Sequence, residues 1–166
     1  MTMTYGELKQ SIQDYTENDE TTFVNNLPLF IRLAEERILK NVSLNLFQKN
    51  QFGNMTTGNQ YLAAPSDFLA PFSLSFDING DADFLYRPAS LTAGADSGTT
   101  WLSENAELSL LYGSLVEAYI FMKGEPQMMQ IYEQRMQESV ARLKNLGEGQ
   151  ETNDEYRKGP VTRQRT

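Results

Sequence analysis

The sequence contains neither cysteine nor histidine among its 166 residues. Without cysteine the chain has no disulfide and no thiol nucleophile, and without histidine it has no imidazole base and no Ser-His triad. The two residue types that most often ligate structural zinc are missing as well. Carboxylates, lysine, tyrosine and unassisted serine are therefore the remaining catalytic groups.

Basic charge is scarce in most of the chain. The formal net charge is −8, with 10 basic and 18 acidic side chains in residues 1–146 but four of each in residues 147–166. A protein that binds nucleic acid tightly should show a basic stripe, and none occurs. No apolar run approaches the roughly 18 residues of a membrane span, and the N-terminus lacks the features of a signal peptide. We expect no membrane contact and a cytoplasm-like compartment, unless the protein is packaged into a particle.

Four segments have the apolar periodicity of amphipathic helices. A short helix should begin at Thr4, which has capping-box spacing to Glu7. Three longer helices are predicted at 22–42, 104–123 and 126–146. Pro28 must either kink the first of these or mark the start of its main part. The interior Gly113 lowers helix propensity and therefore indicates that something packs closely there.

The three longer helices should form one bundle, because no short β region could cover all their apolar stripes. We expect Ser103 or Asn105 to cap the 104–123 helix and Gly124 to terminate it. Pro126 suits the first turn of the last helix, and Gly147 should end it. The apolar stripe of that helix consists of Met129, Tyr132, Met136, Val140 and Leu143. Leu110 and Ile131 are both predicted to be buried.

Residues 43–100 have the short alternating runs and turn residues of a β region. The stretch "FDINGDADFLY" (76–86) resembles a calcium loop, but its sixth place is Ala82 and its twelfth is Pro88, where a calcium hand needs Gly and Glu. We therefore interpret it as a hairpin of 73–78 with 82–87, in which Leu74 pairs with Tyr86.

Candidate catalytic groups have simpler structural explanations. Glu35 and Glu36 are neighbours on a helix and point about 100° apart, so they cannot flank one scissile bond; we predict a solvated helix face. Glu104 and Glu107 suit the positive end of a helix dipole. Trp101 is interpreted as a packing staple or as an interface anchor. No phosphate loop, nucleophile elbow or metal constellation is present, so we predict neither an enzyme nor a cofactor.

The order of segments resembles that of the head-to-tail adaptor (connector) proteins of tailed bacteriophages. The likeness is carried by "FIRLAEERIL" (30–39), "APSDFLAP" (64–71), "YRPASL" (86–91), "TWLSENAELSLLYGSLVEAYIFMKGEP" (100–126) and "YEQRMQESVARL" (132–143). No single motif is diagnostic; their order and spacing carry the match. The sequence departs from the family in its short β part, either because this module is trimmed or because residues near Asp81 to Asp83 are omitted.

The resemblance implies a mainly α fold: a helical-bundle domain over 1–146, a β-hairpin extension within 43–100, and an extended tail. It also implies a non-enzymatic virion protein at the neck, made in the host cytoplasm and assembled as a ring, commonly a dodecamer. Such a ring joins the portal protein to a tail or nozzle protein and lets double-stranded DNA pass without sequence-specific binding. The alternatives are a carboxylate-dependent glycan or cell-wall hydrolase and a stand-alone helical interaction module.

Residues 147–166 form a flexible tail in this interpretation, because they contain too few apolar residues to fold alone. The tail carries an aromatic residue and four basic residues: Tyr156, Arg157, Lys158, Arg163 and Arg165. A solubilising tail and a docking arm are both consistent with this composition. The resemblance favours an arm that docks onto the portal.

Overall fold

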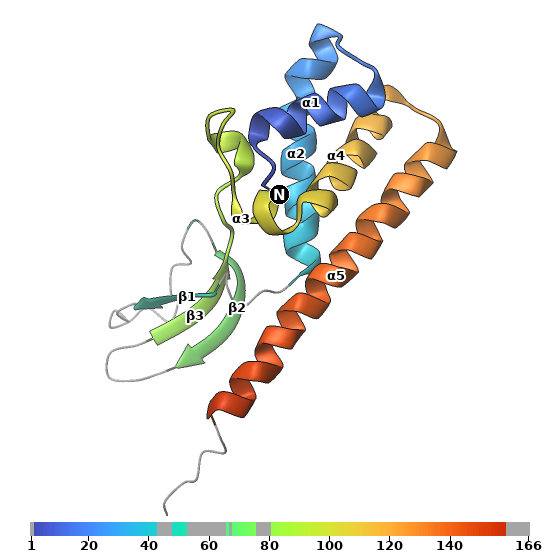
Figure 1. The fold of residues 1–166 in the computed structure, drawn as a ribbon. Coiled ribbons are helices and arrows are strands. Elements are labelled where there is room, and N and C mark those ends of the chain that lie inside the picture. Colours follow the sequence, from blue (N-terminus) through green and yellow to red (C-terminus); the bar gives the residue numbers. More distant parts are fainter. Residues whose placement is uncertain (1, 43–47, 53–65, 67, 76–80, 159–166) are drawn as a thin grey trace, which may run out of the picture.

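The structure, a computed structural model, describes residues 2–42, 48–52, 66, 68–75 and 81–158. This part of the chain is mainly helical, which confirms the predicted fold class at that level. The α-helices in it are α1 (Tyr5–Thr16), α2 (Thr21–Asn41), α3 (Trp101–Asn105), α4 (Glu107–Met122) and α5 (Pro126–Lys158) (Figure 1).

The start of α1 is confirmed as a capping box. The Thr4 hydroxyl accepts a hydrogen bond from the Glu7 amide at 3.3 Å, and the Glu7 carboxylate accepts one from the Thr4 amide at 2.8 Å. These two bonds satisfy amides that a helix start otherwise leaves unpaired. Leu8 and Ile12, one turn apart, then lie fully buried beneath α4.

Pro28 lies inside α2, which is one continuous helix from Thr21 to Asn41. The residue falls in the second turn and removes one backbone donor there. The apolar face of α2, on both sides of Pro28, packs against α4. Its buried members are spaced three or four residues apart: Phe23, Leu27, Ile31, Ala34 and Ile38.

The predicted 104–123 helix is divided into α3 and α4. Neither Ser103 nor Asn105 caps α4; the cap residue is Ala106, which forms no side-chain capping bond. Ser103 instead completes a capping box with Thr100 at the start of α3. At the other end, α4 stops at Met122, two residues before Gly124.

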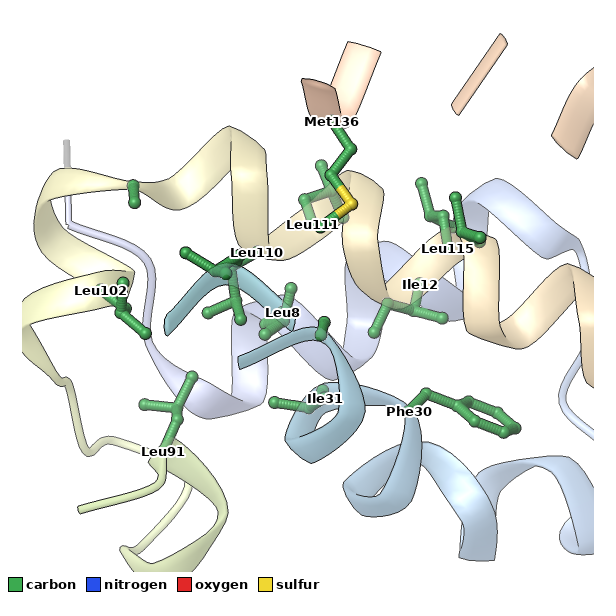
Figure 2. Packing of buried hydrophobic residues seen from close by; sticks show 14 of the residues in the cluster. Leu8, Ile12, Phe30, Ile31, Leu91, Leu102, Leu110, Leu111, Leu115 and Met136 are labelled. Atoms are coloured by element: carbon green, nitrogen blue, oxygen red, sulfur yellow. The ribbon is translucent and has the colours of Figure 1, made fainter. Parts of the chain in front are cut away.

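The centre of the bundle is α4, which packs against α1, α2 and α5 (Figure 1). A Cβ added to Gly113 would lie 3.0 Å from the Cβ of Ala34 and 3.5 Å from the Cε of Met136. The close packing predicted at Gly113 is therefore confirmed, since it lets α2 and α5 approach α4 at one level. Figure 2 shows Leu8, Ile31, Leu110 and Met136 contributing to this core from four helices.

The α5 helix begins at Pro126 as predicted. Its predicted stripe is confirmed: Tyr132, Met136, Val140 and Leu143 are buried, and Met129 packs against them. Two expectations are wrong. Ile131 is 47% exposed, because it lies about 100° around the helix from Tyr132. Gly147 does not end the helix, which continues to Lys158.

A three-stranded antiparallel sheet in the order β1-β3-β2 lies apart from the helices (Figure 1). Its strands are β1 (Gln48–Phe52), β2 (Phe68–Ser75) and β3 (Asp81–Tyr86). Leu74 pairs with Ala82, whereas the prediction paired it with Tyr86. The strand β2 ends at Ser75, which pairs with Asp81 at the start of β3, and β2 contains two register irregularities. The predicted turn at 79–81 is wrong at Asp81, which lies in β3, and residues 76–80 lie outside the described residues.

Candidate docking surface

Glu35 is a buried carboxylate that joins two distant parts of the chain. Glu35 projects from α2 and is only 5% exposed. One carboxylate oxygen accepts a hydrogen bond from the Ser90 hydroxyl at 2.5 Å, and the other accepts one from the Leu91 amide at 2.8 Å. The carboxylate therefore holds the short 3₁₀ turn η2 (Leu91–Ala93) against α2.

The prediction of a solvated face at Glu35 and Glu36 is wrong for the first residue. Burial raises the pKa of Glu35, while the bonds from Leu91 and Ser90 oppose that shift. Glu36 lies at the surface, where a 2.7 Å salt bridge to Lys40 lowers its pKa. The two carboxylates thus differ in environment, and neither faces a partner carboxylate.

A hollow of about 340 Å³ lies beside Glu35, between α2 and the segment that leads into η2. Its lining is largely apolar and comes from α2, from residues 87–90 and from α3. On the α2 side, Leu29 is 41% exposed and Leu33 is 39% exposed. Two large apolar side chains, one helical turn apart, are therefore open to solvent at the same hollow.

The hollow also carries two guanidinium groups, those of Arg32 and Arg87. Neither forms a salt bridge with any other residue that the structure describes. Their charges do act locally, because Arg32 contributes to lowering the pKa of Glu35 and Arg87 to lowering that of Glu36. An apolar floor with free cationic groups suits a partner that presents an apolar side chain between carboxylates.

The residues predicted for docking are placed elsewhere. Trp101 is the first residue of α3 and packs, half-buried, against the core, next to Leu102 of the hollow. Tyr156, Arg157 and Lys158 occupy the last turn of α5. Arg163 and Arg165 lie outside the described residues.

Sequence reasoning missed the hollow because its two walls are far apart in the chain. A signal was present, since Leu29 and Leu33 fall outside the face formed by Ala34 and the other buried residues of α2. Apolar residues on two faces of one helix indicate a second contact. Only the fold shows that residues 87–90 form the other wall.

The described residues show neither a candidate metal site nor a helix that could span a membrane. They contain no group of three or more acidic side chains arranged to hold a metal ion. No helix within the described ranges is both long and apolar enough to span a bilayer.

Comparison with known proteins adds no family. No family model matches the chain, and no curated protein matches it significantly.

Proposed function

We propose that the protein is a structural head-to-tail adaptor of a tailed bacteriophage, which assembles as a ring that connects the portal to the tail and extends the DNA channel. The proposal rests first on the resemblance, whose segments follow one another in the family's order along most of the chain outside the tail. The resemblance also implies two finer features of the fold, a β extension within 43–100 and a docking arm in 147–166.

The observation that carries the proposal is that four of the five resembling segments meet within the bundle. The segment "FIRLAEERIL" lies in α2 and reaches "YRPASL" through the bonds from Glu35 to Ser90 and Leu91. The same helix meets α4 where Ala34 faces Gly113. Segments that follow one another in the family's order are thus in direct contact within one bundle, as expected if they form one structural unit.

Surface charge is consistent with a DNA conduit. The net charge of −8 disfavours tight binding to phosphate, so DNA passing such a ring would slide and not be held. A ring also needs contacts between copies, and the exposed apolar hollow on α2 is a surface of that kind. The alternative of a stand-alone helical module would use the same hollow, so assembly distinguishes the two.

Electron microscopy of the purified protein, alone and mixed with portal rings from the same phage, tests the proposal. We expect ring-shaped particles or a stack of one ring upon the portal. A protein that stays monomeric and leaves portal rings bare at every concentration would be a separate module. Release of soluble sugar from cell walls by the purified protein would instead favour the hydrolase alternative.

Co-sedimentation with portal rings tests the proposed docking arm. Truncation after Gly147 should leave the bundle folded, because it keeps the buried stripe of α5 from Tyr132 to Leu143. We expect the truncated protein to lose attachment, and Tyr156→Ala and Arg157→Ala each to weaken it. Attachment of the truncated protein at the wild-type level would move the docking surface to the bundle or the sheet.

A further inference from the structure

Another exposed apolar side chain, that of Leu108, lies at the start of α4. Leu108 is 47% exposed, and the other large apolar side chains of α4 that are exposed, Ile120 and Phe121, lie near its C-terminal end. Two carboxylates accompany Leu108 in sequence, those of Glu104 at the end of α3 and Glu107 in the first turn of α4. We call these three residues the leucine knob.

The leucine knob and the hollow are different surfaces of the bundle, since Leu108 is not among the residues that line the hollow. Ala34 of α2 and Gly113 of α4 point toward each other, since their Cβ positions would be 3.0 Å apart. Leu29 precedes Ala34 by five residues, and Leu108 precedes Gly113 by five residues. Five residues of an α-helix correspond to a rotation of about 140°. Each leucine therefore points away from the contact between the two helices and is accessible at the surface of the bundle.

The charges of the two surfaces are complementary. The hollow is lined by the carboxylates of Glu35 and Glu36 as well as by Arg32 and Arg87. Glu36 is paired with Lys40 and both oxygens of Glu35 accept hydrogen bonds, whereas neither guanidinium group forms a salt bridge within the described residues. At the knob, Glu104 is exposed and Glu107 is partly exposed. Neither carboxylate forms a salt bridge with another described residue. Opposite charges around two apolar centres favour one orientation of contact and disfavour contact between like surfaces.

We propose that Leu108 of one copy inserts into the hollow of the next copy, beside Leu29 and Leu33, while Glu104 and Glu107 face Arg32 and Arg87. The hollow of about 340 Å³ is large enough for one leucine side chain, because sites of this size commonly hold small molecules. This inference rests on the proposed function, for which it supplies the contact between copies. A contact between different surfaces is heterologous, and a heterologous contact forms a ring when its rotation closes.

Oligomer size, measured by light scattering and by counting copies on portal rings, tests the proposal. Leu108→Asp places a carboxylate in the hollow and should weaken association between copies at least tenfold. Ile131→Asp is the matched control, because Ile131 is also 47% exposed on a helix but lies outside both surfaces. Circular dichroism and thermal midpoints should show both variants folded. Equal association of Leu108→Asp and wild type would overturn the proposed contact.

Charge reversal tests the orientation of the contact. Replacing Glu104 and Glu107 by arginine should weaken association, and so should replacing Arg32 and Arg87 by glutamate. Combining the four changes in one chain should restore assembly, because the charges are again opposite. If the chain with all four changes is folded but does not assemble, these charged groups do not meet.

Different results would contradict the proposed contact between copies and the adaptor proposal itself. Rings that form with Leu108→Asp as readily as with wild type contradict this contact and leave the adaptor proposal standing. A wild-type protein that forms no ring in solution or on the portal contradicts both. If rings form only on the portal, the number of copies bound there replaces the size in solution as the measured quantity.

Discussion

Adding a side chain at Gly113 should separate two helices of the core. A new Cβ would lie 3.0 Å from the Cβ of Ala34, whereas carbon atoms in optimal contact are about 3.5–4.0 Å apart. Ala34 cannot rotate its methyl group away, so α2 and α4 must move apart by about 0.5–1 Å. Overpacking of this kind costs about 1–3 kcal/mol. Gly113→Ala also gains about 1 kcal/mol of helix propensity, which leaves an expected net loss of about 0–2 kcal/mol.

A double-mutant cycle separates the steric cost from the propensity. Ala34→Gly removes the methyl group that the new Cβ would meet, so Gly113→Ala should be better tolerated in that background by about 1–2 kcal/mol. Ala141→Gly, at an exposed position of α5, measures the propensity difference within the same protein. Urea denaturation followed by circular dichroism gives each free energy of unfolding.

Two results would refute the reasoning at Gly113. The first is an additive cycle, in which Ala34→Gly changes nothing about the cost of the added methyl group. The second is stabilisation by Gly113→Ala equal to the propensity measured at Ala141. Either result would mean that α2 and α4 are not held at the distance described.

Two further predictions concern burial. Leu110→Asp should unfold the domain, because Leu110 is fully buried and an unpaired carboxylate there has no partner, whereas Ile131→Asp should change the thermal midpoint little; equal midpoints would contradict the bundle. Glu35→Ala leaves the buried Leu91 amide without its acceptor and should cost about 1–3 kcal/mol in urea denaturation. Because burial raises the pKa of Glu35, the folded state binds the proton more tightly than the unfolded state, and wild-type stability should fall as the pH rises from the ordinary value of 4.5 through the raised pKa. Glu35→Gln lacks this loss, so its stability relative to wild type should increase as the pH rises from 4.5 through the raised pKa of Glu35; a constant difference would show that Glu35 does not titrate in a buried site.

The features that follow from neighbouring residues were predictable from the sequence. The capping box at Thr4 and Glu7 requires only residues three apart, and the start of α5 at Pro126 depends on the missing proline donor. The buried stripe from Tyr132 to Leu143 follows from helical periodicity alone. The packing at Gly113 was also indicated, because a glycine inside a helix has a cost that close contact offsets.

Only the tertiary structure decided which exposed or charged residues found distant partners. The sequence places Glu35 beside Glu36 on one helix, yet Glu35 is buried because Ser90, 55 residues away, donates to it, while Glu36 remains at the surface. Ile131 is apolar and close to a buried stripe, but no segment covers its side of α5. The hollow at Leu29 and Leu33 likewise exists only where a remote turn packs against α2. Local rules assign a residue to a face of a helix, whereas burial depends on the segment that the fold brings against that face.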